Sequence, residues 1–186
     1  MSTILNKNFT YDDYLKINDD KRYEVIEGEL IMNAAPSSKH QIIINNLGYF
    51  ITDFVKKSDL GQVIYSPYDV ILDTNIVVQP DILYISKENS KNIKKRGFFG
   101  SPDLVVEIVS PSSLKRDTED KRNIYKKYGI KEYWIIFPNE EIIEILELEE
   151  GVYKVFNYAS TEDLDKEQKV KSKVLDSLKI ELKDIF

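Results

Sequence analysis

The chain has 186 residues, of which 42% are hydrophobic and 31% are charged, and its formal net charge is −6. This length predicts a single domain over residues 1–186 with a substantial core. The sequence contains no cysteine, which excludes disulfide scaffolds, thiolate metal sites and cysteine nucleophiles and fits a cytoplasmic protein. Because His40 is the single histidine, a zinc site is not expected, and a metal would bind oxygen ligands, as Mg²⁺ or Mn²⁺ does.

The sequence predicts no membrane segment and no signal peptide. No apolar run approaches the roughly 18 residues that a spanning helix requires, and residues 1–14 lack a basic start followed by an apolar stretch. The negative net charge argues against a general nucleic-acid coat protein. Basic residues nevertheless gather at 91–96 and again at 115–127, where each run alone is more simply explained as a solvated surface.

The first predicted elements are a short helix over 9–16, with Thr10 as its N-cap, and a hairpin over 23–33. Ser37 or Ser38 is then expected to cap a long helix that ends near Lys57. The apolar stripe of this helix comprises Ile43, Leu47, Phe50, Ile51 and Phe54. Such a stripe predicts that one face of the helix packs against the core.

The centre of the chain alternates apolar strands with a second helix. The predicted elements are, in order, strands over 62–72, 76–85 and 103–109, a helix over 117–128, a strand over 132–137 and a hairpin over 141–158. The order helix, three strands, helix, strand predicts an α/β fold with a mixed sheet, flanked by the N-terminal and C-terminal hairpins.

Two acids interrupt apolar runs in this central region. Asp81 lies within the run 76–85, and Glu107 lies within the run 104–109. A continuous apolar run is typical of a strand covered on both faces, where an ionised carboxylate is costly unless a cation or hydrogen-bond donors compensate it. Together the two acids could hold one divalent ion. Alternatively, each acid lies at a strand end and reaches solvent, or pairs with a lysine.

A lysine occupies the face of the second helix that should pack on the sheet. Lys121 shares this face with Ile124, Tyr125 and Tyr128 by the i, i+3, i+4, i+7 rule. A lysine in a first helical turn usually extends to water instead. Here the helix directly follows the strand of Glu107, so it would carry the ammonium back toward the two acids. Two carboxylates for a metal and one ammonium for developing negative charge are the components of a phosphodiesterase site.

Several segments of the chain match a known pattern. Pro80-Asp81 is followed, after 25 intervening residues, by Glu107-Ile108-Val109. Further matching segments are 22–30, 36–40, the specific block 100–134 with Asp117, Lys121 and Tyr125, and the tail residues Ser172, Val174 and Leu175. In these residues the chain resembles PD-(D/E)XK nucleases and, more closely, their Uma2 branch. The similarity covers nearly the whole chain.

The resemblance implies a restriction-endonuclease-like core and assigns roles by position. Asp81 and Glu107 would be metal ligands, with the backbone carbonyl of Ile108 as a third. The general motif places a lysine two residues after the acid, where this chain has Val109. In the Uma2 branch this lysine comes from the following helix instead, and Lys121 matches it.

Three further residues are candidates with two interpretations each. Glu24 is, by the resemblance, an additional acid near the metal, and otherwise a surface strand residue. His40 begins the long helix, where the dipole favours its neutral form and it could relay a proton, although a lone histidine there more often makes a structural hydrogen bond. Asp103 shares a strand face with Glu107, and it either neighbours the site or, as we favour, terminates the strand.

The predicted function is metal-assisted hydrolysis of phosphodiester bonds in a nucleic acid, with DNA as the expected substrate and Mg²⁺ or Mn²⁺ as the cofactor. Lys121 would position the attacking water or stabilise charge on the phosphate. The basic residues expected to hold flanking phosphates are Lys94, Lys95, Arg96 and Lys126. A homodimer is expected, because two-fold symmetry matches that of a duplex. Two alternatives are a catalytically inactive nuclease-fold module that binds nucleic acid or protein, and a plain structural or interaction domain.

Overall fold

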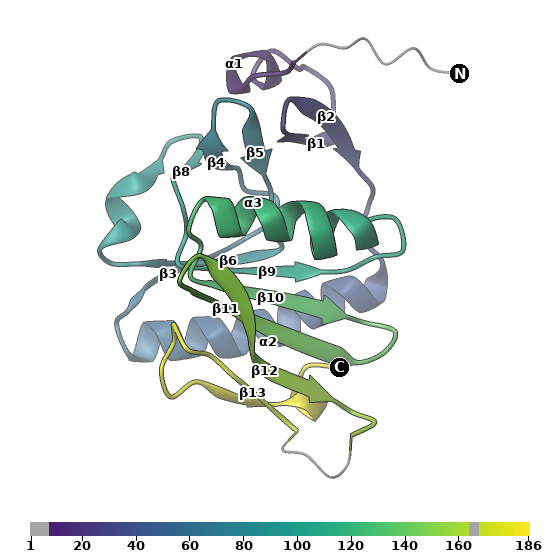
Figure 1. Cartoon of the computed structure of the whole chain (residues 1–186), viewed down its shortest axis with the longest axis vertical. Coiled ribbons are helices and arrows are strands. Elements are labelled where there is room, and N and C mark those ends of the chain that lie inside the picture. Colours follow the sequence, from purple (N-terminus) through teal and green to yellow (C-terminus); the bar gives the residue numbers. More distant parts are fainter. Residues whose placement is uncertain (1–7, 164–167) are drawn as a thin grey trace.

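Two β-sheets and the helices packed on them form the framework of the molecule (Figure 1). The computed structural model describes residues 8–163 and 168–186. Sheet A contains β1 (Arg22–Ile26), β2 (Glu29–Asn33), β4 (Val70–Asp73), β5 (Ile76–Val78), β7 (Ile93–Lys94) and β8 (Gly97–Phe99). Sheet B contains β3 (Gly61–Tyr65), β6 (Ile82–Ser86), β9 (Leu104–Ile108), β10 (Glu132–Phe137), β11 (Ile142–Glu149) and β12 (Val152–Ser160).

The remaining elements are helices and one small hairpin. The α-helices are α1 (Tyr11–Tyr14), α2 (Ser38–Lys57) and α3 (Lys121–Lys127), and a π-helical turn (Arg116–Asp120) leads into α3. Two 3₁₀ turns (Asn89–Asn92 and Leu182–Asp184) and the hairpin of β13 (Lys169–Lys171) and β14 (Lys179–Glu181) complete the described elements. None of the described helices is both long enough and apolar enough to cross a membrane.

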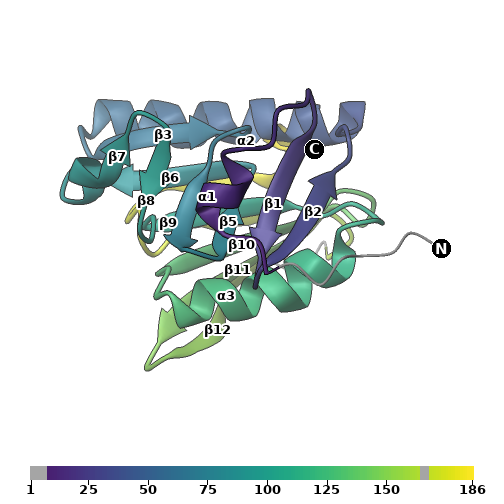
Figure 2. The same cartoon turned by 90° about the horizontal axis from the view of Figure 1, so that it is seen from above.

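The two sheets differ in the order of their strands and in which neighbouring strands run parallel. Sheet A has the order β2-β1-β5-β4-β8-β7, and sheet B has the order β12-β11-β10-β9-β6-β3. In sheet B, β9 runs parallel to β10, whereas the other described pairs are antiparallel, so the predicted mixed sheet is confirmed. Figure 2 shows sheet B lying between α2 and α3.

Side-chain alternation along β9 divides its residues between two cores. Val106 and Ile108 belong to the core beneath α2, whereas Val105 belongs to the core that α3 shares with sheet A. Successive side chains of a strand point to opposite faces. Glu107 therefore presents its carboxylate toward α3 and sheet A, where the polar cluster forms.

Several predicted elements are confirmed, including their caps. Thr10 caps α1 with a capping box, and Ser37 caps α2 by accepting a hydrogen bond from the His40 amide at 3.2 Å. The predicted hairpins correspond to β1–β2 and to β11–β12. The stripe of α2 also packs as expected, with Ile43, Leu47 and Ile51 fully buried.

Two of the predicted strands are wrong in their extent. The stretch 62–72 divides into β3 of sheet B and β4 of sheet A, and the stretch 76–85 divides into β5 of sheet A and β6 of sheet B. Pro67 and Pro80 lie in the two breaks, and proline has no N–H to contribute to a ladder. The prediction also lacks β7, β8, β13 and β14.

The C-terminal segment is tied to sheet B through Glu132, which is fully buried at the start of β10. Its Oε1 accepts hydrogen bonds from Trp134 Nε1 and from Ser172 Oγ. Its Oε2 accepts from the backbone amides of Lys173 and Val174 at 2.7 and 2.8 Å. A buried carboxylate with this many donors is satisfied, and it fixes the path of the tail over the core beneath α2.

Candidate active site

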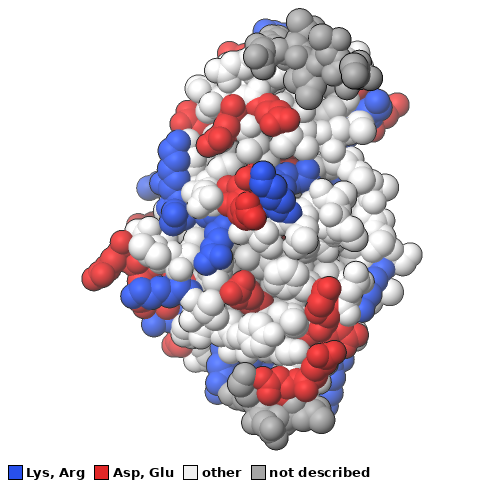
Figure 3. All heavy atoms as spheres, turned by 45° about the vertical axis from the view of Figure 1, so that its right-hand side comes forward, with Lys and Arg blue, Asp and Glu red and all other residues white. Residues whose placement is uncertain are grey.

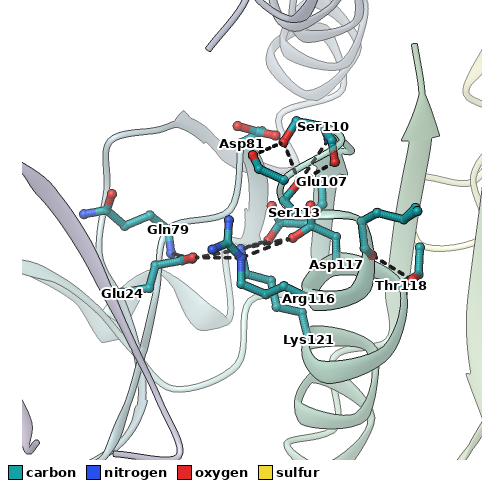
Figure 4. A network of polar contacts seen from close by, with 12 residues as sticks. Glu24, Gln79, Asp81, Glu107, Ser110, Ser113, Arg116, Asp117, Thr118 and Lys121 are labelled. Atoms are coloured by element: carbon teal, nitrogen blue, oxygen red, sulfur yellow. Dashed lines mark hydrogen bonds and ion pairs between the residues drawn. The ribbon is translucent and has the colours of Figure 1, made fainter. Parts of the chain in front are cut away.

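A cleft of about 260 Å³ opens where sheet A, sheet B and the helical segment after β9 meet. Figure 4 shows the polar network at its centre, in which acidic and basic side chains point toward one another from separate parts of the chain. The charged members are Glu24, Asp81, Glu107, Arg116, Asp117 and Lys121. Since both sheets and a helix contribute, the cluster forms only in the assembled fold.

Asp81 lies at the crossing between β5 and β6 and not inside a strand, which corrects the interpretation of the run 76–85. Its side chain remains 15% exposed and lines the cleft. Ile82 pairs with Val106 in the antiparallel β6–β9 ladder, so Asp81 continues that register opposite Glu107. The sheet pairing therefore places the two acids side by side.

Two donors orient one oxygen of the Asp81 carboxylate. The Ile108 amide donates to Oδ2 at 2.8 Å, and His40 Nε2 lies 3.1 Å from the same oxygen. In a neutral imidazole this contact requires the proton on Nε2, which leaves Nδ1 as a buried acceptor without a hydrogen-bond partner in the described part of the chain. Asp81 Oδ1 accepts no hydrogen bond from residues 8–163 or 168–186 and can take another ligand.

Glu107 is held by Lys121 and Tyr125, two of the residues predicted to lie on the packing face of α3. Lys121 Nζ and Tyr125 Oη donate to Glu107 Oε1 at 2.8 and 2.6 Å. The other oxygen, Oε2, has no hydrogen bond to any described residue. Lys121 is only 2% exposed, so the alternative in which it extends to water is wrong.

Glu24 of β1 brings sheet A into the cluster. Its side chain is fully buried, which excludes the surface-strand alternative. Glu24 Oε1 accepts a hydrogen bond from the backbone amide of Gln79 at 2.7 Å and lies 2.8 Å from Lys121 Nζ. Arg116 Nε lies 3.8 Å from Oε2, which has no hydrogen bond in the described structure. Lys121 thus bridges acids from both sheets.

Burial and charge together determine the protonation of the cluster. Burial raises the pKa of Glu107 well above its usual value, although Lys121 opposes this shift. Burial likewise raises the pKa of Asp117. Burial also opposes ionisation of Glu24, but Lys121 and a backbone donor outweigh it and lower its pKa. Burial would lower the pKa of Lys121, yet the surrounding carboxylates raise it, so this ammonium stays protonated.

The donor set fits a hard divalent cation. Glu24, Glu107 and Asp117 lie 2.8, 2.8 and 3.8 Å from the Lys121 ammonium, and Asp81 and Arg116 complete the network in Figure 4, so its four carboxylates outnumber its two cations. Asp81 and Glu107 each keep one oxygen free of protein donors. No three acidic or histidine side chains among residues 8–163 and 168–186 converge as a complete ligand set. Mg²⁺ tolerates this, because it commonly binds one or two carboxylates and keeps waters or phosphate oxygens.

Arg116, Asp117, Gln79 and Tyr125 contribute to the cluster without having been assigned a role from the sequence. In the sequence, Arg116 belongs to a basic run that is simply explained as a solvated surface, and Asp117 is the first residue of a predicted helix. Both lie in the π-helical turn, whose geometry no sequence periodicity indicates. The helical period that identified Lys121 could also have identified Tyr125 as a polar contact, since the two are four residues apart.

Asp103 lies outside the cleft. It precedes β9 and is buried, with hydrogen bonds from the Ser86 amide, Asn89 Nδ2 and Lys131 Nζ at 2.8, 2.9 and 2.9 Å. Glu107 lies at the other end of the same strand. The structure therefore supports the interpretation of Asp103 as a residue that fixes the start of the strand.

The Asp103→Asn variant is expected to lose about 1–3 kcal/mol of stability at pH 7, because Ser86, Asn89 and Lys131 lose an ionised acceptor. Burial raises the pKa of Asp103, but these donors outweigh burial and lower it. A carboxyl with a lowered folded-state pKa stabilises above its unfolded pKa, and its contribution disappears as the pH falls through the folded pKa. The difference from wild type should therefore shrink below about pH 4. Urea unfolding at neutral and acidic pH measures this difference in stability. Equal stability of wild type and Asp103→Asn at pH 7 would contradict the structural role of Asp103.

The basic residues predicted to hold phosphates lie apart from the acids. Lys94, Lys95 and Arg96 lie at the turn between β7 and β8, at the edge of sheet A away from β1. Lys126 lies in the last turn of α3. On the face shown in Figure 3, basic side chains are interspersed with acidic ones and form no continuous basic stripe.

Comparison with known proteins identifies the family and the fold. A family model named Uma2, with the description "Putative restriction endonuclease", matches residues 10–181. A crystal structure from Anabaena variabilis, described as a "putative nuclease belonging to DUF820", is similar with a TM-score of 0.76. The similarity covers 96% of this chain and 97% of that chain at 22% identity, a level that shows the fold alone. A search of curated proteins found no match. The predicted nuclease-like fold is confirmed, and the site roles stay predictions.

Proposed function

The chain belongs to the Uma2 family, and on this basis we propose that it is a divalent-metal-dependent endonuclease that hydrolyses phosphodiester bonds in DNA. The observation that supports this most is that Glu24, Glu107 and Asp117 contact the buried Lys121 in an open cleft that Asp81 also lines. Buried carboxylates at this density are destabilising unless a cation joins them, and such clusters are typical of functional sites.

Asp81 and Glu107 are the proposed ligands of Mg²⁺ or Mn²⁺, with the Ile108 carbonyl as a third. Protein donors fix one oxygen of each carboxylate, which orients the other toward the ion. His40 and Tyr125 are therefore positioning residues in this proposal. When bound, the metal lowers the pKa of a coordinated water and neutralises charge on the phosphate.

Lys121 is the proposed catalytic cation. Its ammonium is desolvated and held by Glu24 and Glu107, both at 2.8 Å, so it is already oriented before a substrate arrives. A preorganised charge of this kind stabilises the negative charge that develops on the phosphate oxygens, or positions the attacking water. Glu24 acts through Lys121, because its second contact keeps the ammonium between the two sheets.

A cleavage assay tests the proposed function. Labelled duplex DNA, single-stranded DNA and RNA are each incubated with the protein in Mg²⁺, in Mn²⁺ and in EDTA. We expect internal cleavage of DNA with either metal and none in EDTA. Size measurement in the same buffers tests the proposed homodimer, since duplex cleavage by one small domain is favoured by two-fold symmetry. Cleavage that persists in EDTA, or absence of both cleavage and metal binding, would contradict the proposal and favour a binding or structural module.

Neutralising Lys94, Lys95 and Arg96 together is expected to weaken the binding of long nucleic acids only. Four β-strand spacings, or roughly 19 Å, separate β7 from β1 in sheet A. One strand of DNA covers this distance with about six nucleotides. The affinity for a longer duplex should show a salt dependence shallower by roughly 2–3 in logarithmic slope. Binding of an oligonucleotide too short to reach the turn should be unchanged. An unaltered slope for the long duplex would assign these residues to solvent.

A further inference from the structure

A second groove, of about 630 Å³, runs along the outer face of α2 beside β3. Two partly exposed aromatic rings line it, Tyr49 with 64% and Tyr65 with 37% of its surface exposed. Asn45, Thr52 and Lys56 lie along the same helix face and add polar groups to the wall. Neither tyrosine belongs to the apolar cores.

The ring of Tyr65 is held in a fixed position against α2. Its hydroxyl donates to the Gly48 carbonyl at 2.8 Å and lies 2.5 Å from Thr52 Oγ1. Gly48 lies inside the helix, where glycine is about 1 kcal/mol less favourable than alanine. A Cβ at this position would overlap the Tyr65 ring. Glycine at position 48 thus lowers the stability of the helix but makes room for the exposed Tyr65 ring. This combination indicates that the ring has a binding role.

The groove continues from the acidic cleft. Gln41 lines both. Tyr65 directly precedes Ser66, which lines the cleft and whose amide donates to the Asp81 carbonyl at 3.1 Å. A chain bound beside Asp81 could thus pass Ser66 toward the Tyr65 ring.

The chemistry of the groove favours bases over phosphates. Of its charged lining residues, Lys56 and Asp53 have opposite signs, and Asp53 is also paired with Lys57 at 2.8 Å. Electrostatic attraction to a polyanion is therefore weak here. Tyrosine rings stack with any base, which is how sequence-independent single-strand sites obtain affinity. We infer that this groove binds unpaired nucleotides that flank the scissile bond, with bases stacked on Tyr49 and Tyr65. The inference rests on the proposed function, because it uses the acids as the point of cleavage.

Fluorescence anisotropy of a labelled oligothymidylate in EDTA tests this site independently of cleavage. The Tyr49→Ala variant is expected to bind roughly tenfold more weakly than wild type, the scale for loss of one stacked base. Tyr158→Ala is the matched control, because Tyr158 is 42% exposed on β12, outside this groove, and its loss should leave the affinity unchanged. The salt dependence of the remaining affinity should be the same in wild type and Tyr49→Ala.

A second variant, Gly48→Ala, tests the binding role of the Tyr65 ring without removing the ring. It improves helix propensity but displaces the Tyr65 ring, so single-strand affinity should fall while the helix is retained by circular dichroism. Unchanged affinity in both Tyr49→Ala and Gly48→Ala would overturn the inference. A change in oligomeric mass without a change in affinity would also overturn it, and would assign the groove to a second copy of the chain. Because the affinity is measured in EDTA, where no cleavage is expected, it does not depend on the outcome of the cleavage and metal-binding assays that test the proposed function.

Discussion

Cleavage by the Lys121→Met variant is expected to be slower than wild type by about a hundredfold or more, the usual scale for losing one preorganised electrostatic group. Methionine fills the volume of the lysine stem and is compatible with a helix. Glu24 and Glu107 would nevertheless lose the ammonium that lies 2.8 Å from each. We therefore also expect a loss of stability on the order of 3–5 kcal/mol at neutral pH, smaller in acid, where protonated carboxyls no longer require a cation. Single-turnover cleavage at saturating Mg²⁺ and urea unfolding measure the two effects.

Two companion variants separate position from charge. Lys127→Met makes the same change at an exposed position of the same helix and should alter neither rate nor stability. Lys121→Arg keeps the positive charge, so it should retain more stability than Lys121→Met, but its planar guanidinium fits the place of a compact ammonium poorly and cleavage should remain low. Equal cleavage rates for wild type and Lys121→Met would show that Lys121 has only a structural role.

The double variant Asp81→Asn, Glu107→Gln is expected to lose cleavage entirely and to lose metal binding with it. Without metal, however, it should be about as stable as wild type, since relief of the repulsion of Glu107 by Asp81, Asp117 and Glu24 offsets the weaker contact with Lys121. Addition of Mn²⁺ should raise the melting temperature of wild type, because a ligand that binds the folded state stabilises it. The same addition should have no effect on the double variant.

The matched control removes the same two charges from the surface. Glu29 and Asp184 are both exposed and lie on β2 and in the C-terminal turn, away from the cleft. The variant Glu29→Gln, Asp184→Asn should keep the Mn²⁺-dependent increase in melting temperature. An equal increase in the Asp81→Asn, Glu107→Gln variant would place the metal elsewhere on the molecule.

Elements with strong local signals could be predicted from the sequence. The capped start of α2 and its apolar stripe were recognisable because each depends on residues a few positions apart. The glycine turn of the β1–β2 hairpin is equally local. Lys121 belongs to the same class, since the period of α3 alone places it with Ile124 and Tyr125 on the buried face.

The crossings between the sheets could not be predicted in this way. Apolar residues continue on both sides of Pro67 and Pro80, because residues in both halves of each run pack in the apolar cores. Val78 and Leu83, on either side of Pro80, belong to one apolar core although they lie in different sheets. Hydrophobic periodicity indicates that a strand is buried, but it does not indicate to which sheet the strand belongs. The apolar run therefore predicts Asp81 inside a strand, whereas it lies between β5 and β6.

Part of the candidate site depends on tertiary structure alone. Arg116 and Asp117 are hydrophilic residues in a charged segment, and such segments usually lie in solvent. The π-helical turn buries Asp117 beside Lys121 and brings Arg116 to within 3.8 Å of Glu24 on the other sheet. No pattern within a single segment contains that information, since the partner lies about ninety residues earlier in the chain.

The buried Glu132 has a consequence for the order in which the chain is synthesised. Three of its four hydrogen-bond donors come from residues 172–174, so a ribosome-bound chain that ends before them contains a buried carboxyl with little compensation. Leu175, Ile180 and Ile185 also complete the core beneath α2. Both sheets and all the proposed catalytic residues are translated earlier. We therefore expect the core beneath α2 to stay incompletely packed until residues 172–185 have left the ribosome.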